Sequence, residues 1–307
     1  MTILHICAGW ELSNGAANIA RMVMEEQRSA GHEVSSATWS SIRNLRSADE
    51  VWIHCAWKPC LWWAALWGKN VHWMPEASYD PVRLRYHGWK KWLVGPVERF
   101  FLRKADRIVA TCEAEKGWIE TYLGKCCPKI EVVDVKRFFD LNRVERVDRV
   151  DGELHLLYLG RRHPLKGVEY LEAAVREVGG QRMVGQRTED RGQRMEPCCR
   201  LRIVSDAFGE EKEKVWEWCD VLVLPTLSEN FGLVIAEALE RGKRVITTDG
   251  APAWGDNLSS VEHVERVEGG EMLAGYGGRL IYLKGYLDGS DEKRVVLLKR
   301  AIERVCG

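Results

Sequence analysis

The chain has 307 residues, of which 45 are basic and 45 acidic, so its formal net charge is zero. This length suffices for two domains with large cores, and the balanced charge gives no global field that would attract nucleic acid. No apolar run approaches the roughly 18 residues of a membrane span, so we expect a cytoplasmic protein.

Ten cysteines are present, but their spacing favours neither disulfides nor zinc. Cys126 and Cys127 are adjacent, as are Cys198 and Cys199, which is an awkward geometry for mutual disulfides. No C-x-x-C pair occurs, so a zinc site is not expected. We therefore expect free thiols in a reducing compartment and no bound metal.

The first half of the chain alternates strand-like and helix-like segments. A strand over residues 3–8 leads through a turn containing Gly15 into a helix over 17–30. Such a small-residue turn lets a backbone approach a phosphate, although most turns of this kind merely connect two elements. Strands that alternate with helices predict a parallel α/β sheet. Further strands are expected at 33–38, 51–57, 71–74, 106–112 and 129–135, and a helix at 113–123.

Aromatic side chains are concentrated in this half, where nine of the fourteen tryptophans lie between Trp52 and Trp118. They either form a platform for the apolar faces of sugar rings or fill the core. His54 and Trp57 end one strand and Glu76 follows the next, so the three are candidates for the acceptor side of a site. The alternative for His54 is a structural histidine.

A basic amphipathic stretch covers residues 80–107, with aromatic residues between its lysines and arginines. Its segment 83–104 either makes a peripheral contact with the inner face of an anionic membrane or forms an ordinary solvated helix. Gly95-Pro96 is expected to break the helix. Residues 136–152 form a charged linker, so the predicted domains are 1–150 and 151–307.

The second half restarts the alternating pattern with a strand at 154–160 and a helix at 168–178. Arg161 and Lys166 lie between them, where a cation opposes the positive end of the helix by roughly 0.3–1 kcal/mol. A bound anion would reverse this cost, because both cations and the free N–H groups would converge on it. The alternative is a pair of surface charges without a ligand. A polar loop over 179–199 then repeats Gly-Gln-Arg-Met without evident chemistry.

The most informative stretch runs from Ser228 to Glu240, between strands at 221–224 and 244–248. Glu229 precedes its helix and Glu237 lies within it. Glu229 either caps the helix or binds a ligand that also contacts the cations. A C-terminal helix at 291–305 is a candidate to pack back on the first domain. Two such halves predict a crevice lined by cations for a diphosphate and carboxylates for hydroxyls, which suits a nucleotide-sugar.

Several motifs resemble the retaining glycosyltransferases of family 4, which have the GT-B fold. Glu229 and Glu237 match the family's E-x7-E pattern inside S-E-N-F-G-L-x-x-x-E-A-L, and residues 160–167 look like its G-R-x-x-x-x-K-G donor loop. Residues 85–91 resemble a segment of members that build lipopolysaccharides and polysaccharides. The resemblance implies two Rossmann-like, doubly wound domains facing a cleft.

The resemblance also implies the role of each matching residue. Arg161 and Lys166 would hold the diphosphate and Glu229 would contact the transferred sugar, which makes these three the catalytic candidates. Glu237 would bind the ribose hydroxyls, and Gly15 would let the first domain's loop approach the phosphates. The remaining donor-binding candidates are Asn230, Phe231, Gly232 and Leu233. Neither a metal nor another cofactor is implied, and the acceptor would be a saccharide or lipid-linked glycan.

Two departures from the family concern the acceptor. Glu76 stands where the resemblance suggests an arginine, and Asp249 stands where a lysine is common. Two other functions therefore remain open. A GT-B sugar phosphorylase would use free phosphate, and a degenerate family member would only bind partners.

Overall fold

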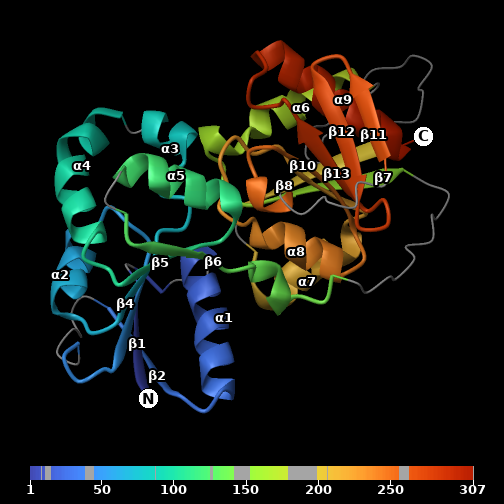
Figure 1. The fold of residues 1–307 in the computed structure, drawn as a ribbon. Coiled ribbons are helices and arrows are strands. Elements are labelled where there is room, and N and C mark those ends of the chain that lie inside the picture. The colour runs from blue at the N-terminus through green and yellow to red at the C-terminus, as the bar shows by residue number, and fades with distance from the viewer. Residues whose placement is uncertain are drawn as a thin grey trace, which may run out of the picture. The chain divides into compact units, whose positions relative to one another are not determined.

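The structure is a computed structural model, in which the chain forms two compact units, Met1–Phe138 and Phe139–Gly307 (Figure 1). The described residues are 1–7, 9–10, 15–38, 45–86, 88–124, 127–141, 153–178, 199–205, 207–255 and 263–306. Asn14 and the Gly-Gln-Arg-Met repeats at 180–183 and 192–195, which the sequence singled out, lie outside these ranges. No disulfide bond joins two cysteines within these ranges.

The first unit contains a six-stranded parallel sheet in the order β2-β1-β3-β4-β5-β6. The chain leaves β1 for one edge and returns to its other side at β3, so the switch point of this doubly wound sheet lies between β1 and β3. The strands are β1 (Thr2–Cys7), β2 (Glu33–Ala37), β3 (Glu50–His54), β4 (Val71–Met74), β5 (Arg107–Ala110) and β6 (Lys129–Val132).

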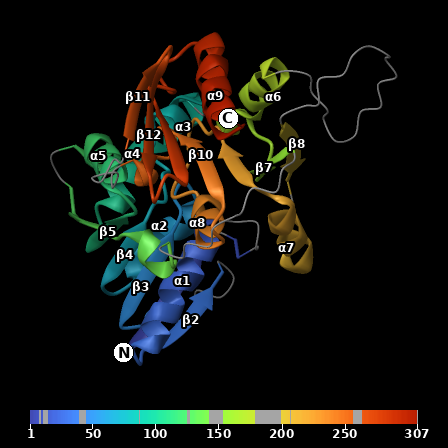
Figure 2. The same cartoon turned by 90° about the vertical axis from the view of Figure 1, so that its right-hand side faces the viewer.

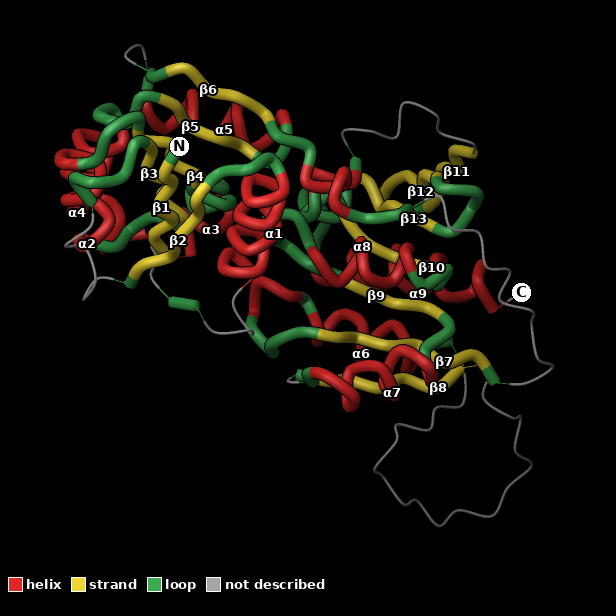
Figure 3. Tube along the Cα trace, turned by 90° about the horizontal axis from the view of Figure 1, so that it is seen from below, coloured by secondary structure: helices red, strands yellow, loops and turns green. Residues whose placement is uncertain are grey.

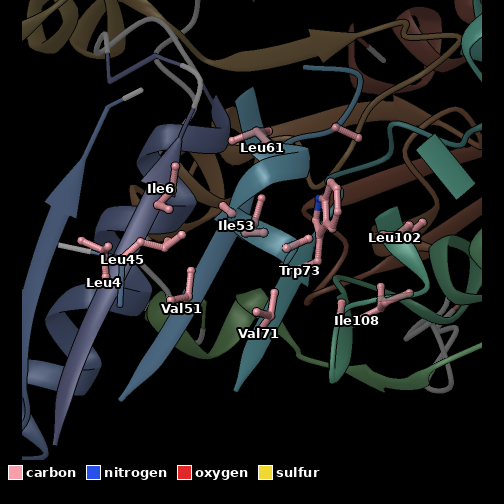
Figure 4. Close-up of a cluster of buried hydrophobic side chains, with 14 of the residues drawn as sticks. Leu4, Ile6, Leu45, Val51, Ile53, Leu61, Val71, Trp73, Leu102 and Ile108 are labelled. Atoms are coloured by element: carbon pink, nitrogen blue, oxygen red, sulfur yellow. The ribbon is translucent and has the colours of Figure 1, made fainter. Parts of the chain in front are cut away.

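Alternate residues of these strands face opposite sides of the sheet. One side packs against α2, α4 and α5 and forms the main core, in which Ile53 and Trp73 are fully buried (Figure 4). The other side carries His5 and His54 and faces α1. The helices of this unit are α1 (Gly15–Ser29), α2 (Pro59–Trp67), α3 (Pro81–Tyr86), α4 (Gly88–Leu102), α5 (Glu113–Leu123) and the 3-10 helix η2 (Val135–Phe138).

The expected break at Gly95-Pro96 is wrong, because α4 continues through both residues. Proline inside a helix removes one backbone hydrogen bond, but tertiary contacts hold this helix on both sides of it. Tyr122 donates a hydrogen bond to the carbonyl of Gly95, at 3.0 Å between the oxygen atoms, and Glu98 and Leu102 are fully buried. Packing has overridden local propensity here.

The second unit contains a seven-stranded sheet in the order β11-β12-β13-β10-β9-β7-β8. Its strands from β13 to β8 are parallel, and β11 and β12 add an antiparallel edge. The chain goes from β7 to the edge strand β8 and returns to β9, so the switch point lies between β7 and β9, which are neighbours (Figure 3). The strands are β7 (Leu154–Leu159), β8 (Cys199–Val204), β9 (Val221–Leu224), β10 (Arg244–Thr248), β11 (His263–Val267), β12 (Gly270–Gly275) and β13 (Leu280–Lys284).

The helices of the second unit lie beside its sheet. They are η3 (Pro164–Lys166), α6 (Val168–Glu177), α7 (Gly209–Trp218), α8 (Leu233–Glu240), η4 (Pro252–Trp254) and α9 (Asp291–Cys306). The C-terminal helix α9 packs against α6 and β13 of its own unit (Figure 2). The predicted contact of this helix with the first domain stays a prediction. Within the described ranges, every helix is too short or too polar to cross a membrane.

Candidate active site

Three loops come together at the carboxyl ends of β7, β9 and β10. The backbone N–H of Leu227 donates to the carbonyl of Leu165 at 2.9 Å, and the N–H of Glu229 donates to the carbonyl of Gly250 at 2.8 Å. Gly167 has a left-handed backbone with φ of 61°, and a Cβ atom there would lie 2.2 Å from the carbonyl oxygen of Pro225. Only glycine fits this contact, so the loop after β7 is held close to the loop after β9.

Lys166 and Glu229 form an ion pair across these two loops. The ammonium also donates to the carbonyl of Ser228 at 3.3 Å, and a carboxylate oxygen of Glu229 accepts from the N–H of Asn230 at 3.1 Å. The two side chains are 18% and 20% exposed. The structure thus brings together two residues that lie 63 positions apart and that the sequence assigned to one site.

Arg161 is exposed and has no ion-pair partner within the described part of the chain, whereas its neighbour Arg162 pairs with Glu172 at 2.5 Å. The guanidinium of Arg161 is therefore available to an incoming anion. Tyr158 donates to the carbonyl of Arg161 at 2.9 Å and so holds the start of this loop. Burial, together with the charge of Glu229, raises the pKa of the Tyr158 hydroxyl, which keeps it a donor at neutral pH.

The N-terminus of α8 follows Glu229 directly. Gly232 has φ of 71° and precedes the first helical residue, Leu233. Phe231 is buried, and its carbonyl accepts a hydrogen bond from the indole N–H of buried Trp254. Trp254 thereby fixes the turn that leads into the start of α8, and the N-terminal end of a helix is suited to bind anions. The sequence indicated the turn but gave no role to Trp254.

Glu237 lies on α8, one turn beyond the helix start. Its two carboxylate oxygens lie 2.8 and 2.7 Å from the ammonium of Lys212 on α7. Sequence reasoning missed Lys212, because nothing in the spacing of α7 relates it to a residue 25 positions further along the chain.

Asp249, where a lysine is common in the family, has a structural role in this chain. Its carboxylate accepts from the N–H groups of Gly285 and Leu287 at 2.8 and 3.0 Å. Burial raises the pKa of Asp249, while these two hydrogen bonds act in the opposite direction. The aspartate therefore joins the end of β10 to the loop that follows β13.

In the first unit, His54 and Glu76 belong to a buried chain of hydrogen bonds. Nδ1 of His54 lies 3.2 Å from Oε1 of Glu76, and Nε2 of His54 lies 3.0 Å from Nδ1 of His5. The chain ends at Gln27 of α1, whose side-chain oxygen lies 2.7 Å from Nε2 of His5. Neither His5 nor Gln27 was predicted, although a histidine inside an apolar strand was a signal available in the sequence.

Electrostatics favours the neutral form of each titratable group in this chain of hydrogen bonds. Burial lowers the pKa of both His54 and His5 to about 3. Burial and the nearby Glu115 raise the pKa of Glu76 well above its usual value. A protonated Glu76 donates to Nδ1 of His54, His54 donates from Nε2 to His5, and His5 donates from Nε2 to Gln27. Every hydrogen bond in the row then has one donor and one acceptor.

The backbone near Glu76 is strained. Cys55, Trp57, Glu76 and Ala77 all have left-handed backbone angles, with φ between 54° and 72°. Such angles are uncommon for residues with a side chain and cluster at functional sites. Trp57 is held by hydrogen bonds from its N–H to Glu98 at 3.0 Å and from its indole to the Ser78 carbonyl at 3.1 Å. The acceptor-side role of His54, Trp57 and Glu76 stays a prediction.

Gly15 is the first residue of α1 and is exposed, with open space where a Cβ atom would lie. This position would tolerate an approaching ligand, but the residues just before it are outside the described ranges. The predicted contact of Gly15 with a phosphate stays a prediction.

Comparison with known proteins accounts for this architecture. Residues 37–135 match the family model of the glycosyl transferase 4-like domain, and residues 153–265 match that of the glycosyl transferases group 1. The two matches together cover more than two thirds of the chain. The chain belongs to the group 1 glycosyltransferases. This confirms the resemblance inferred from the E-x7-E and donor-loop motifs.

Solved structures similar to this group 1 glycosyltransferase share the GT-B fold, as predicted. Anabaena HepE, solved with UDP and glucose, has a TM-score of 0.60 at 14% identity, over 99% of this chain and 90% of HepE. WaaG, a glycosyltransferase involved in lipopolysaccharide biosynthesis, has a TM-score of 0.60 at 12% identity, over 98% and 90% of the two chains. At these identities the likeness shows the fold alone.

Two curated relatives match parts of the chain. The D-inositol 3-phosphate glycosyltransferase of Segniliparus rotundus is 27% identical over 55% of this chain and 43% of its own. An uncharacterized glycosyltransferase of Methanocaldococcus jannaschii is 30% identical over 32% of this chain and 28% of its own. The chain thus matches less than half the length of either relative.

Proposed function

We propose that the protein is a retaining glycosyltransferase that moves a sugar from a nucleotide-sugar donor to a saccharide or lipid-linked glycan acceptor of a cell-surface polysaccharide or lipopolysaccharide. The observation that carries this proposal is the meeting of Lys166, Glu229 and the start of α8 at the β7–β9 switch point. Parallel sheets bind ligands at this place. HepE, which shares the fold, was solved with UDP-glucose.

The donor's diphosphate would lie at the loop after β7. An ammonium has three N–H donors, and those of Lys166 now contact Glu229 and the carbonyl of Ser228. A diphosphate oxygen would give the Lys166 ammonium a second anionic partner beside the Glu229 carboxylate. Exposed Arg161 supplies the second cation. The N–H groups at the start of α8 complete an anion site that requires no metal ion.

The reaction then needs little from the protein beyond positioning and charge stabilisation. The bond between the anomeric carbon and the phosphate oxygen breaks while the acceptor's hydroxyl oxygen bonds to the same face of that carbon. The acceptor's proton passes to the departing phosphate oxygen. Lys166 and Arg161 stabilise the negative charge that develops on the leaving diphosphate. Glu229 holds the sugar's hydroxyls, and Glu237 those of the ribose.

A thermal-shift panel of UDP, GDP, ADP and their sugars tests the donor site. A ligand at a hundredfold over its Kd adds about 2.7 kcal/mol to the free energy of unfolding. Arg161→Ala should abolish most of this shift, whereas Arg162→Ala provides a matched control because Arg162 is engaged with Glu172. No shift with any nucleotide, or equal losses in both variants, would contradict the assigned site.

Product analysis separates transfer from the other two functions. A transferase releases the nucleoside diphosphate only when an acceptor sugar is present and keeps the anomeric configuration of the donor. A phosphorylase would incorporate radiolabelled inorganic phosphate into sugar phosphate. A protein that only binds partners would show the thermal shift without turnover.

We also propose that the first unit touches an anionic membrane through an aromatic face on α2 and α4, which pack side by side (Figure 1). We define this face by the exposed side chains of Trp63, Trp67, Trp89, Trp92 and Phe100. Lys90 lies over the ring of Trp89 and Lys104 over that of Phe100, and Glu98, the acid of α4, is buried. Exposed aromatic rings beside cations suit an interface with anionic lipids.

Sedimentation with lipid vesicles tests this contact. The protein should bind vesicles that contain phosphatidylglycerol more strongly than vesicles of phosphatidylcholine alone, and added salt should weaken binding. Trp92→Ser with Phe100→Ser should reduce binding, while Phe208→Ser removes an exposed aromatic of the other unit as a control. Equal binding of both variants would overturn the assignment of this face.

A further inference from the structure

Lys212 occupies an unusual position in α7. It lies in the first turn of the helix, immediately after Glu210 and Glu211. Acidic residues suit a helix start and a lysine does not, because the N-terminal end of a helix carries a partial positive charge. The ion pair with Glu237 compensates for this placement. Lys212 is thus held in place by a residue of α8 and not by the residues of its own helix.

The geometry of this ion pair leaves room for a ligand on the carboxylate. The ammonium of Lys212 contacts both oxygens of Glu237, at 2.8 and 2.7 Å. An ionised carboxyl group has about four lone-pair positions, so the ion pair with one ammonium leaves acceptor capacity on the carboxylate. The side chains of Lys212 and Glu237 are 27% and 24% exposed, although Oε2 of Glu237 itself is buried, so the pair is largely shielded and only part of it is reached from solvent.

We propose that Lys212 is a positioning residue for the donor's ribose, an inference that rests on the proposed nucleotide-sugar function. Lys212 neutralises Glu237, which would otherwise repel the donor's diphosphate, and holds its carboxylate in one orientation. The carboxylate then accepts hydrogen bonds from the hydroxyl groups of the ribose. The pair therefore selects ribonucleotides over 2′-deoxyribonucleotides, which lack one of these hydroxyls.

The structure also offers a contact that separates this role from a merely structural one. Glu213, the next residue of α7, pairs with Arg241 at 2.8 Å and so joins α7 to the C-terminal end of α8. Arg241 in turn donates to the backbone carbonyl of Glu237 at 3.1 Å. If Lys212 served only to dock α7 on α8, breaking the Glu213–Arg241 pair should have a similar effect.

The test compares Lys212→Met with two controls. Lys214→Met removes an exposed lysine from the same helix, and Glu213→Gln breaks the other ion pair between the two helices. Calorimetry measures the Kd of UDP, GDP and ADP, each beside its 2′-deoxy counterpart. For the nucleotide that binds, wild type should prefer the ribose form about tenfold, and Lys212→Met should reduce this preference to about twofold while weakening overall affinity. Both controls should keep the wild-type preference.

Each other result overturns the proposal in a distinguishable way. An unchanged preference in Lys212→Met would show that Lys212 does not act on the ribose, while the nucleotide site itself stands. An equal loss in Glu213→Gln would assign the effect to helix docking. If none of the three nucleoside diphosphates binds the wild type, the proposed donor site fails and this inference fails with it.

Discussion

Glu76→Gln tests the neutral hydrogen-bond chain in the first unit. The substitution replaces a buried carboxyl group by an amide of nearly the same shape. The amide N–H group donates to Nδ1 of His54 as a protonated carboxyl would, so the hydrogen bond survives. Only the proton that Glu76 exchanges with solvent is lost.

The sign of the effect follows from the raised pKa of Glu76. In the unfolded chain this carboxyl titrates near its ordinary pKa of 4.5, whereas burial keeps it protonated to a higher pH in the folded protein. Between the two pKa values the unfolded state has released a proton that the folded state retains. The contribution of Glu76 to the free energy of unfolding therefore falls by about 1.4 kcal/mol for each pH unit in this interval and is constant above it.

Urea denaturation of wild type and variant between pH 4.5 and 8 measures this difference. The two proteins should be about equally stable at pH 4.5, and the variant should become progressively more stable than the wild type as the pH rises. Glu113→Gln, at an exposed position of α5, is the control and should show no such trend. A variant that is less stable at pH 7 would refute the reasoning, because Glu76 would then be ionised and paired with a protonated His54.

Three further substitutions test the donor side. Gly167→Ala should destabilise the fold by roughly 1–3 kcal/mol, since its methyl group would meet the Pro225 carbonyl at 2.2 Å. The melting temperature and the nucleotide affinity should fall together, and an unchanged affinity would show that this loop does not bind the nucleotide. Trp254→Phe removes the N–H that holds the Phe231 carbonyl. It should lower the free energy of unfolding, measured in urea, by about 1–3 kcal/mol and reduce the thermal shift caused by the nucleotide. Unchanged stability together with an unchanged thermal shift would contradict the role given to Trp254. Asp249→Ala leaves two backbone N–H groups after β13 without their acceptor and should lower stability by a similar amount, whereas a neutral result would mean that water replaces the carboxylate.

Local patterns in the sequence were sufficient for the architecture. Alternating strand and helix signals predicted parallel sheets, because each apolar run needs a helix to cover it. The same patterns placed Lys166 after one strand and Glu229 after another, with a helix start beside the second. Motif resemblance then related these loops to nucleotide-sugar binding, and the family matches confirm the class.

Contacts between residues far apart in the chain could not be predicted in the same way. The continuity of α4 through Pro96 depends on the Tyr122 hydroxyl and on buried Glu98, which the local sequence does not reveal. The regular structure after Trp254 depends on pairing of β11 and β12 with the edge of a sheet. In neither segment is the hydrophobic periodicity strong enough to predict this structure.

The amino-acid sequence by itself determined most of the strands and helices as far as Trp254, the C-terminal helix and which loops carry charged residues, since those properties depend mainly on neighbours within a few positions. Only the tertiary structure decided which side chains meet. His5 and His54 are bonded because β1 and β3 are adjacent and His5 is in register with Trp52, two residues before His54, so both side chains face one side of the sheet. Lys212 reaches Glu237 because the chain returns from β8 to β9 and thereby brings α7 beside α8. The order of the strands in each sheet determines these side-chain contacts, and that order is a property of the whole fold.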